Sequence, residues 1–79
     1  MKYSITVTLK KDVLDPQGKV VENTLKNMGL NSLKSVRQGK YFEIEVEENN
    51  QEVADKEVTQ MCEKLLANLI IEDYKINKL

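Results

Sequence analysis

The chain has 79 residues, of which 41% are hydrophobic and 32% are charged, a balance typical of folded domains rather than disordered segments. Twelve basic and 13 acidic residues leave a net charge of −1, which excludes the basic footprint of a nucleic-acid or anionic-membrane binder. The absence of histidine excludes serine–histidine, cysteine–histidine and histidine–zinc chemistry. We expect a single domain over residues 1–79. Because a domain this small buries only about 60% of its unfolded surface, we also expect an oligomer or a partner.

The cysteine content and the hydropathy pattern bear on the cellular compartment. Cys62 is the only cysteine, so no internal disulfide forms, and its apolar neighbours favour a buried, unreactive thiol. No apolar run is long enough to span a membrane, and no signal-peptide pattern precedes the first expected strand. We therefore expect a cytoplasmic protein.

The first two elements have clear sequence signatures. Residues 3–9 alternate between apolar and polar side chains, which predicts a half-buried strand. A helix is predicted from Pro16 to Met28, because Asp15 can cap free N–H groups and proline fits the first helical position. Gly18 falls in the first turn, where glycine costs roughly 1 kcal/mol relative to alanine. A strong helix start followed at once by a poor helix former indicates a second constraint at Gly18, which the residue types alone do not identify.

The middle of the chain predicts a β-hairpin. Gly29 should end the first helix in a left-handed conformation. Two extended segments, 33–38 and 40–47, then flank Gly39, and the second alternates strictly between apolar and polar side chains. Two strands on either side of one short glycine turn predict a hairpin with its turn at Gly39.

A second helix and a final strand complete the pattern. Asn49, with Glu52 three residues later, is typical of a capping box, and the helix should run to about Ala67. Its predicted apolar face has helical spacing and consists of Ala54, Val58, Met61, Cys62 and Leu65. Asn68 is predicted to end the helix, and residues 70–76 are predicted to form the last strand.

The predicted order is strand–helix–strand–strand–helix–strand. This is the ferredoxin-like βαββαβ arrangement, an α+β fold with two helices on one face of an antiparallel sheet. The other face carries Thr6, Thr8, Glu43 and Glu45 and should be solvated. Tyr41 on that face fits a solvated position and an interface equally well.

Several motifs could carry chemistry, and each has a plainer explanation. Arg37 and Lys40 flank the predicted turn, where they serve either solubility or contact with an anion or a partner. Lys10 and Lys11 could bind a phosphate at a helix start, but nearby aspartates oppose it. The acidic residues within 43–48 project in parallel and do not converge on a metal. The stacking aromatics of an RNA-binding sheet are missing from the central strands.

Three parts of the sequence together resemble one family. They are Val13–Gly18, Val36–Lys40, and Cys62–Asn68 running into Ile71–Tyr74. Their order and spacing resemble PurS, the small subunit of phosphoribosylformylglycinamidine synthase in bacteria and archaea, over essentially the whole chain. One departure is Leu69, because the family often has a proline at that place, and it affects only the local turn.

The resemblance implies a function that the composition does not. Complexes of this family convert formylglycinamide ribonucleotide to formylglycinamidine ribonucleotide and consume ATP and glutamine. A large subunit carries the amidation, which uses ATP and Mg²⁺, and a glutaminase subunit releases ammonia. The small subunit has no active site and binds no cofactor. It oligomerises as a dimer or tetramer, bridges the other two subunits and could help ammonia to pass between them, with no nucleic acid or membrane involved.

The resemblance also selects the residues expected to contact partners. The expected roles are close backbone approach at Gly18, charge contacts at Arg37 and Lys40, and hydrogen bonding at Asn68. The full set comprises Asp15, Pro16, Gly18, Arg37, Gly39, Lys40, Asn68 and Glu72. No catalytic or metal-ligating residue is expected. The alternative is a free-standing ferredoxin-like regulatory module that binds a small effector at a subunit interface.

Overall fold

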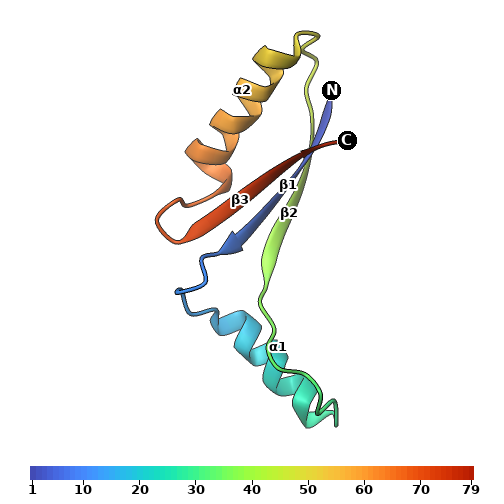
Figure 1. Cartoon of the computed structure of the whole chain (residues 1–79), viewed down its shortest axis with the longest axis vertical. Helices are drawn as coiled ribbons and strands as arrows, with labels where there is room; N and C mark the ends of the chain where they lie inside the picture. Colours follow the sequence, from blue (N-terminus) through green and yellow to red (C-terminus); the bar gives the residue numbers. More distant parts are fainter.

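Three antiparallel strands and two helices make up the fold. The structure, a computed structural model, describes all 79 residues. Its elements are β1 (Lys2–Leu9), α1 (Pro16–Asn27), β2 (Gly39–Glu45), α2 (Gln51–Met61), the π-helical turn η1 (Cys62–Leu66) and β3 (Glu72–Lys78). The strands form one sheet in the order β2-β1-β3, with β1 in the centre (Figure 1). The predicted α+β class with an antiparallel sheet is confirmed.

The hydrophobic core lies between the central strand and α2. Tyr3, Ile5 and Val7 of β1 are at most 1% exposed, in agreement with the alternation of the sequence. The helical side contributes three fully buried residues spaced four apart, Ala54, Val58 and Cys62. The predicted burial of the single cysteine is thus confirmed, and desolvation raises the pKa of its thiol.

The ends of the helices lie close to their predicted positions. α1 begins after Asp15 and ends before Gly29, whose φ of 93° confirms the predicted left-handed residue. α2 is capped by Asn50, whose side chain accepts hydrogen bonds from two N–H groups of the first turn at 2.9 and 3.3 Å. The predicted cap at Asn49 is therefore wrong by one residue.

A π-turn at the end of α2 changes which side chain packs on the core. Such a turn holds one residue more than an α-turn, so the apolar stripe advances by one position. Leu66 packs against the core, while Leu65 is 83% exposed. The predicted apolar face is therefore wrong at Leu65. After the turn, the last strand begins at Glu72 rather than at residue 70.

The predicted hairpin is wrong. Residues 33–38 have no strand partner in the chain, and Gly39 begins β2 instead of forming a turn. The backbone continues from this segment into β2 without reversing its direction (Figure 1). A Cβ atom at Gly39 would lie 2.6 Å from the carbonyl oxygen of Val7 on β1. The glycine therefore marks a close approach of two strands.

Only α2 covers the sheet within one chain. α1 lies beyond the end of the sheet, beside the segment 33–38 (Figure 1). The molecule measures 51 × 25 × 14 Å, and its radius of gyration is 16.1 Å, against about 12 Å for a compact chain of this length. Apolar side chains of α1 remain exposed, to 65% at Val20 and 69% at Met28. Within a single chain the two helices therefore do not pack on one face of the sheet, contrary to the prediction.

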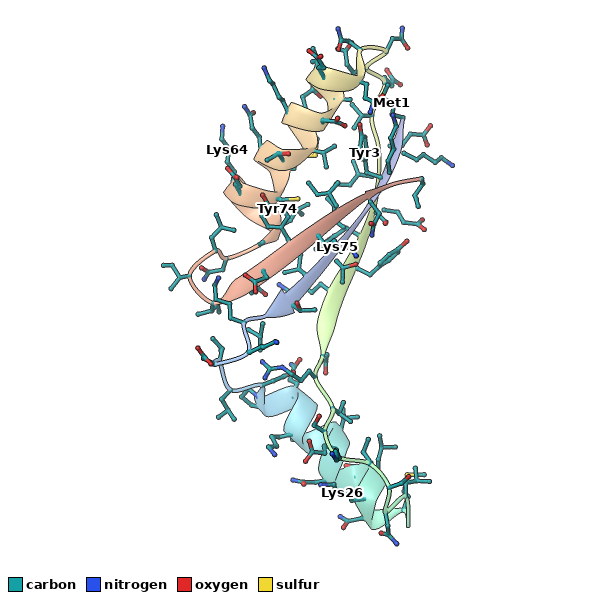
Figure 2. The ribbon with its side chains drawn as sticks, viewed as in Figure 1. Met1, Tyr3, Lys26, Lys64, Tyr74 and Lys75 are labelled. Atoms are coloured by element: carbon teal, nitrogen blue, oxygen red, sulfur yellow. The ribbon has the colours of Figure 1, made fainter.

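A tyrosine–aspartate hydrogen bond closes one end of the core. Tyr3 and Met1 lie together at the start of β1 (Figure 2). The buried Tyr3 hydroxyl donates to Oδ1 of Asp55 on α2 at 2.6 Å. This hydrogen bond, followed by desolvation, raises the pKa of Tyr3 from 10.0 to about 12.

The raised pKa predicts an alkaline loss of stability. A hydroxyl whose pKa is higher in the folded state stabilises the fold below pH 10.0, and this contribution disappears as the pH rises to about 12. When urea unfolding is measured over a series of pH values, Tyr3→Phe should not show this alkaline loss of stability. The same variant should lack the highest-pH step in the absorbance titration of the tyrosines. Tyr41→Phe, at an exposed ring, is the control and should retain both steps. A titration of Tyr3→Phe that matches the wild type would contradict the assignment.

Candidate functional site

Several expected site residues meet where β1 ends, α1 begins and β2 starts. A cavity of about 150 Å³ opens there and is called the junction cavity. Its lining consists of Val7, Leu9, Asp15, Gln17, Gln38, Gly39, Lys40 and Glu72. Four of the eight expected residues therefore share one cavity, although they lie up to 57 positions apart (15 to 72) in the sequence.

Asp15 both caps α1 and holds the chain segment that leads into β2. Its Oδ1 accepts the Gly18 N–H at 2.9 Å, and its Oδ2 accepts the Gln38 N–H at 2.6 Å. The residue is buried, and these two hydrogen bonds, led by that of Gln38, lower the pKa of its carboxyl group. Asp15 is therefore a capping residue with a second, tertiary partner.

Glu22 repeats this arrangement two turns further along α1. Its side chain is 6% exposed, and its Oε1 accepts the Val36 N–H at 3.1 Å. Lys26 and Lys19 lie 3.3 and 3.4 Å from its other oxygen. The hydrogen bond from Val36 is the main cause that lowers the pKa of Glu22.

We call the bonds Val36–Glu22 and Gln38–Asp15 the carboxylate latch. The sequence analysis did not identify Glu22. A signal was present, because residues seven apart lie on the same helix face, and Asp15 and Glu22 have this spacing. The latch uses alternate N–H groups of an extended segment, as a neighbouring strand would, but the acceptors are carboxylates of a helix.

Gly18 allows α1 and the extended segment to touch. A Cβ atom there would lie 2.7 Å from the Val36 carbonyl oxygen and 2.5 Å from Oδ2 of Asp15. The predicted close approach of a neighbouring backbone is confirmed, and the neighbour is residue 36 of the same chain. A contact of Gly18 with another subunit stays a prediction.

The Arg37 side chain holds the loop between β1 and α1. Its guanidinium donates to the carbonyl oxygens of Val13, Lys10 and Lys11 at 2.8, 3.0 and 3.3 Å. Three carbonyls on one guanidinium use the fixed fork of donors that lysine lacks. This internal role was not predicted, and a partner contact at Arg37 stays a prediction.

Asn68 and Glu72 close the loop between α2 and β3. The Asn68 N–H donates to Glu72 Oε1 at 2.7 Å, and the Glu72 N–H donates back to the Asn68 carbonyl at 2.7 Å. Lys40 reaches the other carboxylate oxygen of Glu72 at 3.9 Å. The closed loop presents Ile70 at 84% exposure, and Leu69, at the place of the family's frequent proline, at 46%.

The carboxylates of the site are already occupied by backbone groups. No set of three or more His, Cys, Asp or Glu side chains is placed to hold a metal ion. No helix has the length and apolar content needed to cross a membrane.

Pro16 lies exposed at the first position of α1, next to the exposed Val20 and Val21. The geometry is that of a structural joint with exposed apolar surface around it.

Comparison with known sequences identifies the family. Residues 2–79 match the family model PurS, described as phosphoribosylformylglycinamidine (FGAM) synthase. The chain is 47% identical over 74 residues to the PurS subunit of this synthase from Bacillus subtilis, covering 94% of this chain and 87% of that protein. The chain belongs to the PurS family. The PurS subunit of Thermotoga maritima is 36% identical over 78 residues, with 99% of this chain and 95% of that protein covered.

Solved PurS structures share the fold of this chain. A structure of B. subtilis PurS superposes with a TM-score of 0.87 at 46% identity, covering 96% of this chain and 94% of the other. A chain in the structure of PurLQS from T. maritima gives a TM-score of 0.90 at 36% identity, covering 99% and 95%. The elongated shape, with α1 off its own sheet, is therefore shared with these PurS family structures.

The close approach at Gly18 predicts the effect of a single methyl group. Gly18→Ala gains about 1 kcal/mol of helix propensity, but the overpacked methyl costs more, so the free energy of unfolding should fall by about 1–2 kcal/mol. Urea unfolding measures this change. Asn23→Ala, at an exposed position of α1, is the matched control and should be neutral or stabilising. A Gly18→Ala protein more stable than the wild type would contradict the close approach.

The carboxylate latch predicts a specific sensitivity to acid. Because folding lowers the pKa values of Asp15 and Glu22, both stabilise the fold above their unfolded values of 3.8 and 4.5. This contribution is lost as the pH falls below those values and through the lowered pKa values of the folded state. Urea unfolding in steps down to about pH 2 should show a shallower acid loss for Glu22→Gln than for the wild type. Glu47→Gln, at an exposed position, should keep the wild-type slope. An unchanged slope in Glu22→Gln would contradict the latch.

Proposed function

We propose that this chain is the PurS subunit of phosphoribosylformylglycinamidine synthase in de novo purine biosynthesis. In this role it bridges the glutaminase subunit and the ATP-dependent amidating subunit. The observation that carries the proposal is the match to the PurS family over residues 2–79, together with the TM-score of 0.90 to a chain of PurLQS. We expect the subunit to act in the cytoplasm.

We propose that the subunit has a structural rather than a catalytic role. The carboxylates of the junction are engaged by backbone N–H groups, and the single thiol is buried with a raised pKa. Neither group is free to act as a base or nucleophile. ATP and Mg²⁺ are therefore assigned to the large subunit, and the amidation chemistry with them. Any aid to ammonia transfer would come from the way this chain positions its partners.

The exposed loop after α2 is our proposed contact with a partner subunit. Ile70 projects there at 84% exposure, and the neighbouring Leu69 is 46% exposed. Asn68 and Glu72 hold the loop in one conformation through reciprocal hydrogen bonds, so little conformational entropy remains to be lost on binding. Exposed apolar side chains on a fixed loop are typical of an interaction site.

Reconstitution with the two partner subunits tests the proposal. Glutamine-dependent amidation by the large and glutaminase subunits should require this chain. Amidation with ammonium chloride bypasses the glutaminase and should not require it. Ile70→Asp should reduce the glutamine-dependent rate at least tenfold, and leave the ammonium-dependent rate unchanged, while Val53→Asp on α2 is the matched control. A glutamine-dependent rate that is equal with and without this chain would overturn the proposed function.

A further inference from the structure

The loop between α2 and β3 carries the most exposed large apolar side chain of the protein. Ile70 is 84% exposed there, and residues 67–71 belong to no helix or strand. An irregular segment at the surface is mobile unless its backbone groups are bound. The contacts that fix the loop therefore decide how Ile70 is presented.

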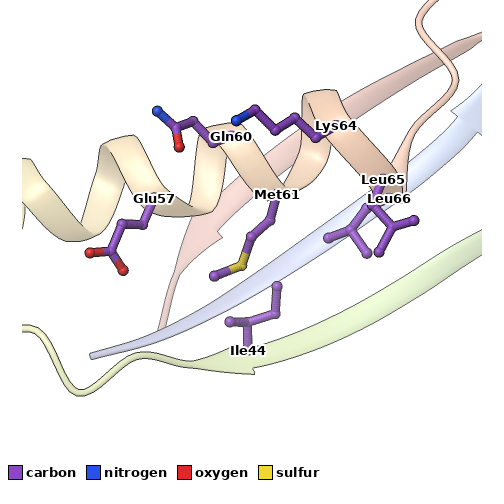
Figure 3. A pocket seen from close by; sticks show the side chains of 7 residues that line it. All are labelled: Ile44, Glu57, Gln60, Met61, Lys64, Leu65 and Leu66. Carbon is purple, nitrogen blue, oxygen red and sulfur yellow. The ribbon is translucent and has the colours of Figure 1, made fainter.

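Both ends of the loop are anchored in the fold. Before the loop, Leu66 packs on the core and lines a groove of about 460 Å³ between α2 and β2, where Ile44 faces the helix (Figure 3). Ala67 is 5% exposed, and its N–H donates to a carbonyl oxygen of the π-turn η1 at 2.9 Å. After the loop, Glu72 begins β3 and pairs with the central strand β1. Only the conformation of residues 68–71 depends on contacts of the loop itself.

Asn68 and Glu72 supply these contacts. The Asn68 side chain accepts the Ile70 N–H at 3.2 Å. The Asn68 carbonyl oxygen accepts the N–H groups of Ile71 and Glu72 at 3.0 and 2.7 Å. These hydrogen bonds form a local turn of the kind that asparagine commonly makes. One further hydrogen bond comes from outside the turn, because the Asn68 N–H donates at 2.7 Å to Oε1 of Glu72 on β3.

The Glu72 carboxylate is placed by the sheet rather than by the loop. Its side chain lines the junction cavity and is 12% exposed, although the loop lies at the surface. Lys40 of β2 lies 3.9 Å from its second oxygen, so the largely buried negative charge has a cation beside it. A strand residue whose side chain is held by its surroundings is a rigid support for a binding residue. At this low exposure, Glu72 itself offers little surface to a partner.

We propose that Glu72 is a positioning residue that fixes the loop so that Ile70 meets the partner subunit in one conformation. Its Oε1 atom holds the Asn68 N–H, and Lys40 balances the charge of the carboxylate. The loop then loses little conformational entropy on binding. Glu72 acts through Ile70 and not by the direct partner contact expected from the sequence. This inference rests on the proposed function, because it concerns the loop proposed there as the contact with a partner.

A titration in the reconstituted complex tests the positioning role. The full-length chain is added to the large and glutaminase subunits, and the concentration that gives half of the maximal glutamine-dependent rate is measured. Glu72→Ala should raise this concentration about tenfold, as expected when about one residue must be ordered on binding, and leave the maximal rate unchanged. Glu72→Gln keeps an acceptor oxygen and should stay within about threefold of the wild type. Glu47→Ala, which removes an exposed carboxylate, is the matched control.

A double variant separates positioning from direct contact. If Glu72 acts only through Ile70, adding Glu72→Ala to Ile70→Ala should raise the half-maximal concentration no further. Additive effects of the two substitutions would overturn the inference. A folded Glu72→Ala protein that matches the wild type in the titration would overturn it as well.

Glu72→Asp tests the inference even if Glu72→Ala fails to fold. This variant keeps the charge beside Lys40 but shortens the side chain by one methylene group, so the carboxylate no longer reaches the Asn68 N–H. The Asn68 amide should exchange its hydrogen faster than in the wild type, and the half-maximal concentration should rise as for Glu72→Ala. Wild-type values of both would overturn the inference. If the wild-type chain is itself not required for glutamine-dependent amidation, the proposed function fails instead.

Discussion

The carboxylate latch is the constraint on which the shape of the chain depends. Two buried carboxylates on one face of α1 bind the N–H groups of Val36 and Gln38. Burying a charge with too few partners is costly, so a structure that separates α1 from this segment must expose both carboxylates or bury each with one hydrogen bond fewer. Gly18 permits the contact and Arg37 fixes the loop that precedes it. Residues around 10–38 therefore behave as one unit, attached to the sheet through β1 and β2.

This constraint connects the fold to the proposed assembly role. Because α1 is held beside the extended segment, it cannot cover the sheet of its own chain. The apolar stripe of α1, the groove between α2 and β2 and the outer edge of β2 are left uncovered within the chain. The loop at Asn68–Glu72 lies on another part of the chain, beyond the end of α2, and exposes the apolar side chains of Leu69 and Ile70 (Figure 1). A small chain with two such surfaces suits a subunit that organises larger partners.

Local sequence signals predicted the parts of the fold that local chemistry determines. The alternation of β1, the start of α1 at Asp15 and the left-handed Gly29 are all set by neighbours within a few residues. The hairpin was wrong because a strand, a glycine and a second strand have the same local pattern whether the chain turns or continues. Tertiary contacts decide between the two. Here Gly39 is required because the backbone of Val7 lies too close for a side chain at this position. The missed π-turn exchanged Leu65 for Leu66 for a similar reason, since periodicity assumes a constant 3.6 residues per turn.

Hydrogen exchange at the amides of Val36 and Gln38 tests the central claim most directly. If the carboxylate latch holds α1 to this segment, both amides are hydrogen-bonded although no strand of the chain pairs with residues 33–38. They should then exchange at least roughly tenfold more slowly than an amide without a partner. The amide of Lys78, which alternates on β3 with the hydrogen-bonded amide of Leu79, is the internal reference and should exchange rapidly. Exchange at Val36 and Gln38 as rapid as at Lys78 would contradict the account.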